Sequence, residues 1–420
     1  MFSGMGSRDY PSCPLRATAA WFARMTIVDR RPPHRPQLRI LTSLRFFAAA
    51  EVIIFHFGRM TDVDLVALYF GSAPTTFPGN FVHLATSAGH EAVSFFFVLS
   101  GFILTYVYAG TAESQGFAAR KSDFWWARFA RIAPTFYLGL LVSLPFLLYS
   151  VLVAHSVAPS RLMASLLLAP AFLQSWWPPV VYLWNFPSWS LSVEFLFYAL
   201  FPLLASAAAF LPRRQFLLLA LALVVATAYA RAALFSHFHG APNSLSDVAI
   251  YFPPLSVPQF ILGIALARVF LYGPVLPSRA YKAILFLGLV ATVAMFGWQS
   301  DLPPWLMWAR TETGTVGIPF GAIIFGAAGA AGSFRLLASP AMVFLGDASY
   351  SMYILHIPVS LWWKWIATKA LGLTVPPLLN FAVMVVLVIA IAALNQAYLE
   401  PPLRRWLLRR WPLRRGARSS

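Results

Sequence analysis

Residues 38–57 read LRILTSLRFFAAAEVIIFHF and decide the fold of this chain. The stretch is apolar and long enough to cross about 30 Å of hydrocarbon, for which a helix needs roughly 20 residues. It nevertheless holds Arg45, Glu51 and His56. Ionisable side chains at membrane depth are costly and are usually functional. The stretch therefore predicts a membrane span that carries part of a functional site.

The whole chain has the composition of a membrane protein. Hydrophobic residues make up 59% of its 420 residues and charged residues 11%, whereas a soluble domain carries about 25% charged residues. The net charge of +17 does not indicate nucleic-acid binding, because the cations cluster at the termini and between apolar runs. Cys13 is the single cysteine, so we expect neither a disulfide scaffold nor a metal site.

Apolar segments of spanning length recur along the chain. A further run, 162–173, is too short to cross and is closely followed by Pro178 and Pro179, so we expect a re-entrant or interfacial segment there. The predicted fold class is all-α, a polytopic transmembrane helix bundle of about ten spans with one re-entrant segment. The spans are expected near 40–58, 91–109, 132–153, 189–211, 215–235, 251–272, 283–299, 314–332, 342–363 and 377–398.

The distribution of Lys and Arg predicts the orientation. With a cytoplasmic N-terminus and ten crossings, 25 of the 31 basic residues fall inside and six outside, as the positive-inside rule requires. Both termini are therefore expected in the cytoplasm. We divide the chain into a disordered basic cytoplasmic tail (1–38), one membrane domain (39–400) and a basic cytoplasmic C-terminal tail (401–420).

Two residues of the first span lie on one face of the predicted helix. Arg45 and His56 are 11 residues apart, which corresponds to about 1100° of rotation and an axial rise of about 16 Å. The predicted orientation puts Arg45 near the inner mouth and His56 in the outer half. A snorkelling arginine and an interfacial histidine would be the purely structural explanation.

Further polar residues lie in three later segments. In FWWARFARIAPTFY, Arg128 and Arg131 are three residues apart and so share a helical face; paired guanidinium groups suit a phosphate-bearing ligand, although anchoring to anionic lipid is the alternative. Glu194, in WSLSVEFLFYALFP, is a carboxylate inside an aromatic span. In SYSMYILH, Tyr353 and His356 share a face. The predicted topology places Glu194 and His356 in the outer half with His56.

In this order, these motifs resemble the membrane acyltransferase-3 family. The matching pieces are the Arg–x10–His pair formed by Arg45 and His56, FFFVLSGF, RFARIAP, WSLSVEFLFYALFP and SYSMYILH. The resemblance implies an integral membrane O-acyltransferase in the inner (plasma) membrane of a bacterium. It implies acyl-CoA as cytoplasmic donor substrate, no bound cofactor, and a glycan or glycolipid acceptor outside the cytoplasm.

The residues and the resemblance together assign roles. We expect catalysis from His56, Arg45 and Glu194. We expect substrate binding by Arg128, Arg131, Trp189, Tyr353 and His356. Thioester transfer to an alcohol needs a base, and imidazole has an unperturbed pKa near 6.5; an acyl-histidine intermediate is a second route. Acetyl is the expected acyl group, while the sequence leaves chain length and acceptor open.

A transporter or flippase of lipid-linked sugars is the alternative function. Many spans with buried charges also fit that class, but such proteins often show internal repeats and Gly- or Pro-broken helices in matching halves, which we do not find. A structural subunit without catalysis is a third possibility, and the shared faces of buried Arg, Glu and His argue against it.

Overall fold

The computed structural model describes residues 35–61, 89, 91–111, 116–238, 245–298 and 304–410. Within these ranges every extended regular element is a helix, and the β-pairing found there is one isolated bridge between Ala109 and Phe117. The all-α prediction is thereby confirmed. The α-helices are α2 (Arg39–Thr61), α5 (Glu91–Tyr108), α6 (Lys121–Leu152), α7 (Pro159–Leu168), α8 (Trp189–Ala208), α9 (Arg213–Phe238), α10 (Leu245–Tyr251), α11 (Val257–Tyr272), α12 (Ser278–Trp298), α13 (Gly317–Gly329), α14 (Pro340–Trp365), α15 (Pro377–Leu394) and α16 (Glu400–Arg410).

Eight helices in the described parts are long and apolar enough to cross a membrane, which makes the chain a multi-pass helical bundle. Two of the ten predicted spans are not among the eight. The segment 314–332 contains only the 13 residues of α13, which rise about 20 Å. The other, α14, has 26 residues but includes Asp347, His356 and Lys364, whose polarity lowers its hydropathy.

Helix α6 begins 11 residues before the predicted span 132–153. Pro134 and Pro145 lie inside it, and the helix continues through both. Proline is tolerated in membrane helices because neighbouring groups satisfy the backbone carbonyls that it leaves without a donor. The RFARIAP segment is consequently about two turns of α6, and both of its arginines project from that helix.

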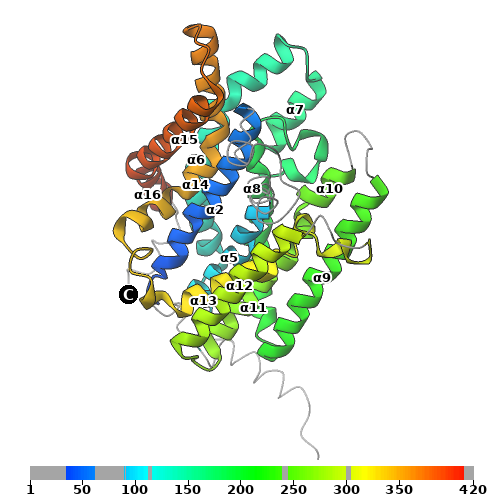
Figure 1. The fold of residues 1–420 in the computed structure, drawn as a ribbon, viewed down its shortest axis with the longest axis vertical. Helices are drawn as coiled ribbons and strands as arrows, with labels where there is room; N and C mark the ends of the chain where they lie inside the picture. The colour runs from blue at the N-terminus through cyan, green and yellow to red at the C-terminus, as the bar shows by residue number, and fades with distance from the viewer. Residues whose placement is uncertain are drawn as a thin grey trace, which may run out of the picture.

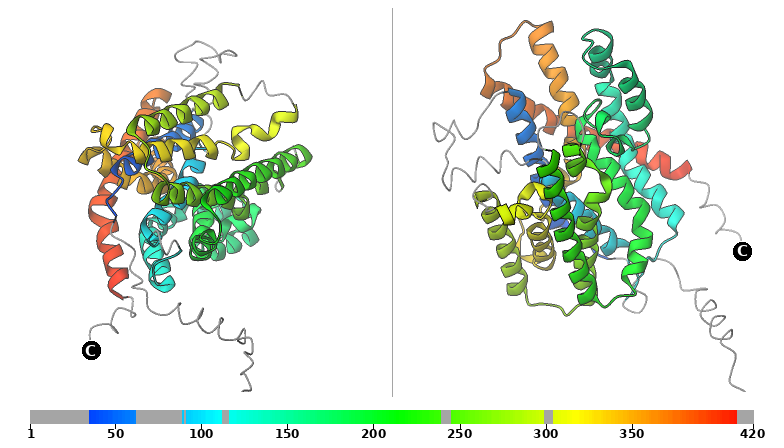
Figure 2. Two further views of the ribbon diagram at one scale, coloured as in Figure 1. Left: turned by 90° about the horizontal axis from the view of Figure 1, so that it is seen from below. Right: turned by 90° about the vertical axis from the view of Figure 1, so that its right-hand side faces the viewer.

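The helices form two groups that meet along α2 and α8 (Figure 1). Helix α14 packs against α2, α6 and α15, while α11 packs against α5, α9 and α13. Helix α2 touches α5 and α13 as well as α14 and α15, and α8 touches α5, α6 and α11. Helices α16 and α9 lie on opposite sides of the molecule (Figures 1 and 2). Residues of α2 and α8 therefore face the junction between the groups.

Two helix pairs are in backbone contact at glycines. A Cβ atom on Gly263 of α11 would lie 2.0 Å from the carbonyl oxygen of Val98 in α5, and one on Gly101 would lie 2.1 Å from that of Phe260. A Cβ atom on Gly346 of α14 would lie 2.0 Å from the carbonyl oxygen of Thr42 in α2. Small residues allow such close approach between membrane helices. These glycines thus allow α5 to contact α11, and α14 to contact α2, at backbone distance.

The chain between α7 and α8 is irregular. Helix α7 has 10 residues and is followed by 3-10 turns at Gln174–Trp176, Pro178–Val180 and Phe186–Ser188. The run 162–173 is thus too short a helix to span, as expected, while its re-entrant or interfacial position stays a prediction.

Residues 1–34 of the N-terminal tail and 411–420 of the C-terminal tail lie outside the described residues, whereas 401–410 belong to α16. The expected disorder of the N-terminal tail and the cytoplasmic location of both tails remain predictions. Of the predicted N-terminal tail, Arg35 is described, and its guanidinium group donates hydrogen bonds to the carbonyl oxygens of Tyr106 and Gly110 at the end of α5.

Substituting Gly263 with alanine should destabilise the fold, because the new Cβ atom meets backbone that cannot move aside. We expect a loss of about 1–3 kcal/mol, typical of overpacking, measured as a lower unfolding midpoint of the detergent-purified protein. Gly332→Ala is the matched control, since no atom lies within 4 Å of its added Cβ. Equal midpoints for the two variants would contradict the assigned contact.

Candidate functional site

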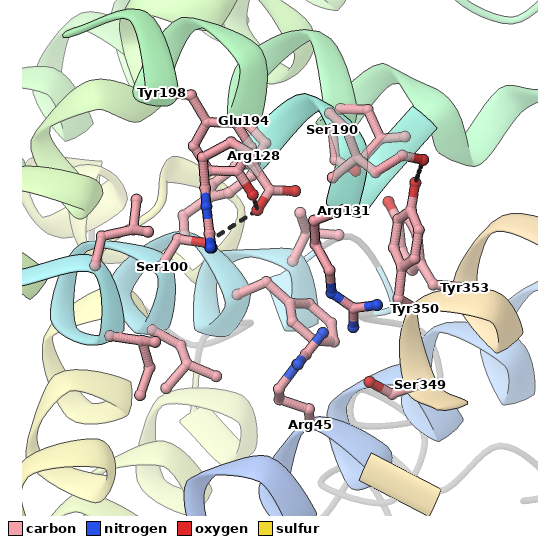
Figure 3. Close-up of a pocket in the computed structure, with 18 residues that line it drawn as sticks. Arg45, Ser100, Arg128, Arg131, Ser190, Glu194, Tyr198, Ser349, Tyr350 and Tyr353 are labelled. Atoms are coloured by element: carbon pink, nitrogen blue, oxygen red, sulfur yellow. Dashed lines mark hydrogen bonds between the residues drawn. The ribbon is translucent and has the colours of Figure 1, made fainter. Parts of the chain in front are cut away.

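A cavity of about 160 Å³ lies where α2, α5, α6, α8 and α14 meet (Figure 3). Apolar side chains such as Phe96, Phe97 and Ile132 form part of its wall. The polar lining residues are Arg45, Ser100, Arg128, Arg131, Ser190, Glu194, Tyr198, Ser349, Tyr350 and Tyr353. Five helices remote in sequence therefore contribute polar groups to one enclosed space.

Glu194 is held at the wall of this cavity by two hydroxyl groups. The Ser100 hydroxyl donates to Oε1 of Glu194 at 3.3 Å, and the Tyr198 hydroxyl donates to the same oxygen (Figure 3). Tyr198 is one helical turn further along α8, which is why its side chain reaches the carboxylate. These bonds fix the carboxylate in a space that also holds three guanidinium groups.

The two arginines of α6 are held in different ways. Arg128 donates a hydrogen bond of 3.1 Å to the Tyr108 hydroxyl, and its guanidinium carbon lies 5.4 Å from the centre of that ring. Arg131 forms an ion pair with Glu400, whose side chain is 2% exposed. The two arginines share the cavity, as their spacing predicted.

Glu400 belongs to a buried polar cluster that joins α6, α14 and the C-terminal helices. Its Oε2 accepts hydrogen bonds from Thr135 Oγ1 at 3.1 Å and Ser351 Oγ at 3.5 Å. Asn395 donates to the same two hydroxyl groups, at 2.9 and 2.8 Å. A π-helical segment, Asn395–Leu399, separates α15 from α16 and ends directly before Glu400. Such segments often occur at functional sites.

A second cavity, of about 540 Å³, adjoins the first and shares Arg45, Arg131 and Ile103 with it. We call it the arginine vestibule. Its charged lining residues are Arg35, Arg45, Arg131, Arg404, Asp347 and Glu400. Four guanidinium groups face two carboxylates, so the vestibule carries a net positive charge. Guanidinium forks match phosphate and carboxylate oxygens, and the vestibule is therefore suited to an anionic ligand.

The two candidate histidines meet at the other end of α2. Nε2 of His356 lies 3.1 Å from Nδ1 of His56, and the ring centres are 5.0 Å apart. Nδ1 of His356 lies 2.8 Å from the carbonyl oxygen of Tyr353, and Nδ1 of His56 lies 2.9 Å from that of Val52. His356 is fully buried.

These contacts assign a tautomer to each ring when both are neutral. A carbonyl oxygen only accepts hydrogen bonds, so Nδ1 of His356 carries the proton and its Nε2 is an acceptor. Nδ1 of His56 then carries a proton as well, directed at Val52 and at His356. The unprotonated nitrogen of His56 is its Nε2, which is the atom available to act as a base.

The predicted site residues thus form two groups. Arg45, Arg128, Arg131, Glu194 and Tyr353 line the first cavity, whereas His56 and His356 contact each other beyond it. Glu194 lies with the arginines, although the sequence placed it beside the histidines. Tyr353 links the groups, because its side chain lines the cavity while its carbonyl oxygen faces the His356 ring.

Trp189 belongs to neither group. Its side chain is 5% exposed and packs edge-on against the rings of Phe97 and Tyr251. It does not line the first cavity or the vestibule. Its position is suited to holding α8 against α5 and α10, and its expected contact with substrate stays a prediction.

The site residues expected from the sequence did not include Glu400 or Ser100. The available signal for Glu400 was a carboxylate placed directly after the last apolar run, in NQAYLEPP. Its partner Arg131 is more than 260 residues away, so no local pattern could reveal the pair. In the described ranges no group of three or more His, Cys, Asp or Glu side chains could hold a metal ion.

Replacing Glu400 with glutamine should destabilise the protein and disturb the vestibule, because Arg131 would lose its charged partner. Removing one member of a buried ion pair costs about 3–5 kcal/mol. The unfolding midpoint of the purified variant measures this loss. Glu312→Gln is the control, because Glu312 is more exposed and pairs with Arg310. It should change the free energy of unfolding by at most about 1 kcal/mol. Similar midpoints for the two variants would show that the Arg131 pair contributes little.

Comparison with known proteins gives one family. The family model described as an acyltransferase domain matches residues 39–394. An acyltransferase of Streptomyces mycarofaciens (MdmB) is 28% identical over 348 residues, covering 78% of this chain and 80% of that protein. The exopolysaccharide production protein ExoZ of Rhizobium meliloti is 29% identical over 340 residues, covering 77% of this chain and 94% of that protein.

A third relative is longer. The peptidoglycan O-acetyltransferase OatA of Listeria monocytogenes is 25% identical over 336 residues, and the match covers 76% of this chain but about half (51%) of that protein. No solved structure matches the chain. The matched model covers most of the chain, including every site residue expected from the sequence, whereas Arg35, Glu400 and Arg404 of the vestibule lie outside it. This chain therefore belongs to the membrane acyltransferase-3 family and is an acyltransferase.

Proposed function

We propose that this protein moves an acyl group, with acetyl the simplest case, from cytoplasmic acyl-CoA to a hydroxyl group of an extracytoplasmic glycan or glycolipid. In this proposal both termini lie in the cytoplasm of a bacterium and the protein resides in its inner membrane. A reporter active only outside the cytoplasm should then give no signal when fused after Ser420.

The observation that carries the proposal is the placement of two unlike groups along α2. Arg45 lines both the first cavity and the arginine vestibule, and 11 residues later His56 meets His356. The rise between them is about 16 Å. A cationic cavity and a histidine pair at this separation suit a donor whose charged part and reactive part are far apart.

Acyl-CoA has this form. Its phosphate groups are anionic, and its pantetheine arm is a long, thin chain that ends in the thioester. The vestibule offers guanidinium groups to the phosphates. The first cavity would take the arm past Glu194 and Tyr353 towards the histidines. The nucleotide stays in the vestibule, and only the narrow arm enters the bundle.

The histidine pair supplies the base. Nε2 of His56 takes the proton of the acceptor hydroxyl as its oxygen attacks the thioester carbonyl carbon. The tetrahedral intermediate then collapses, the carbon–sulfur bond breaks, and the thiolate leaves with the proton from the imidazolium. His356 accepts the hydrogen bond from Nδ1 of His56, which orients the ring and maintains the tautomer in which Nε2 carries no proton.

The relatives support the acceptor class. One is named as a peptidoglycan O-acetyltransferase and another as an exopolysaccharide production protein. Both names concern carbohydrate polymers, and the first specifies transfer to oxygen. The family assignment also favours acyl transfer over the transporter that the sequence left as an alternative.

His56→Asn should abolish acyl transfer while the protein still inserts and binds the donor, because the base is lost and the vestibule is unchanged. Transfer of radiolabel from acetyl-CoA to glycan, with the purified protein in detergent, measures this. His155→Asn is the matched control, since His155 is exposed and has a positive φ of 50°, which asparagine tolerates. Activity of His56→Asn near that of the control would refute the assignment.

Arg45→Ala should weaken donor binding, because a hydrogen bond to a charged group is worth about 1.5–3 kcal/mol. The dissociation constant of acetyl-CoA, titrated in the absence of acceptor, measures the effect. Arg120→Ala is the control, because Arg120 is an exposed cation paired on the surface with Asp123. Unchanged donor affinity in Arg45→Ala would remove the vestibule from the proposal.

A further inference from the structure

A group of aromatic side chains, two of them exposed and one, Tyr251, buried, lies next to the histidine pair. It is built by the irregular segment before α8 together with α10 and the residue after it. We call it the aromatic platform and define it as Trp176, Tyr182, Phe186, Tyr251 and Phe252. Trp176 is 40% exposed and Tyr182 is 43% exposed. Both side chains nevertheless contact other rings of the platform. The expected site residues do not include any of these five.

The rings of the platform pack in two groups, Tyr182 with Phe186 and Tyr251, and Trp176 with Phe252. Tyr182 stacks on Phe186 with centres 5.0 Å apart and an interplanar angle of 29°, and it meets Tyr251 edge-on at 5.2 Å. Trp176 meets Phe252 edge-on at 5.5 Å. Each exposed ring therefore has a fixed orientation and little conformational entropy to lose on binding, which is how rigid aromatic side chains contribute to binding surfaces.

The platform reaches the histidine pair through one ring. Phe186 meets His56 edge-on, with centres 5.5 Å apart. Tyr182 is thus separated from His56 by a single intervening side chain. A molecule lying across Tyr182 would have its next unit near the proposed base.

A carboxylate lies within the platform. The Tyr182 hydroxyl donates a hydrogen bond of 2.6 Å to Oδ1 of Asp247, a partly buried residue of α10. Aromatic residues also gather at membrane interfaces to anchor helices in lipid, which is the alternative for this surface. A carboxylate beside the rings argues against that role, because burying an ionised group in lipid is costly.

Apolar ring faces beside a carboxylate match the chemistry of a sugar. One face of a pyranose presents C–H groups that pack on an aromatic ring, and its hydroxyl groups donate hydrogen bonds to a carboxylate. We propose that Tyr182, Trp176 and Asp247 form a subsite for a sugar ring of the acceptor, adjacent to the unit whose hydroxyl is acylated at His56. This inference rests on the proposed function and names the acceptor contact that function needs.

Binding of sugar without turnover tests the subsite. The probes are neutral oligosaccharides of N-acetylglucosamine, one to four units long, titrated against the detergent-purified protein by calorimetry. We expect affinity to rise with length and Tyr182→Leu to weaken binding of the longer probes at least tenfold. Tyr182→Phe, which keeps the ring and loses the bond to Asp247, should lose less. Tyr149→Leu, at an exposed tyrosine of α6 (59%), is the matched control and should bind normally.

Transfer kinetics separate this inference from the proposed function. With radiolabelled acetyl-CoA, Tyr182→Leu should raise the KM for the longer oligosaccharides while the dissociation constant of acetyl-CoA stays at the wild-type value. If the wild-type protein binds the oligosaccharides but moves no label to them, the proposed function fails and the subsite stands. If wild type and Tyr182→Leu bind them equally, or if neither binds, the subsite is overturned whatever the transfer result.

Discussion

The backbone contact between α2 and α14 is the constraint on which the site depends. Gly346 has no side chain, so α14 can lie directly against the carbonyl oxygen of Thr42. A Cβ atom at this position would be only 2.0 Å from that oxygen. From there the two helices run side by side in the same direction until His356 meets His56. A side chain at Gly346 would separate the helices and so part the two imidazoles. Close packing at one end of the pair thus sets the chemistry at the other.

At the opposite end of α2, an ion pair and hydrogen bonds from hydroxyl groups stabilise the buried charges. Burying Arg131 would be costly without Glu400, and the carboxylate itself is satisfied by Thr135 and Ser351. The remaining guanidinium groups of the arginine vestibule outnumber its carboxylates. Their mutual repulsion falls when an anion binds between them, so the same arrangement that costs stability in the empty protein favours an anionic ligand.

The polar features are arranged as one sequence of sites along α2. The vestibule adjoins the first cavity through Arg45 and Arg131, and Tyr353, which lines that cavity, has its carbonyl oxygen beside the His356 ring. Beyond the histidines, Phe186 connects to the aromatic platform. In the proposed function each site has its own part: the vestibule would bind phosphates, the first cavity would hold a flexible arm, the imidazoles would transfer a proton and the rings would contact carbohydrate. This order is the one that the proposed transfer, from a donor at one side to an acceptor at the other, would need.

The sequence by itself determined the fold class, most of the membrane helices and most of the site residues, because spanning length, charge depletion and helical spacing are local properties. It could place Arg45 and His56 on one face of a helix, and Arg128 beside Arg131. It could not show that the α-helix within 314–332 has only 13 residues or that α6 continues through its prolines. Nor could the sequence predict that His56 contacts His356, that Arg131 forms an ion pair with Glu400, or that Glu194 lies with the arginines. Those contacts join residues that are tens to hundreds of positions apart, so they depend on how the helices pack, and only the tertiary structure decides that.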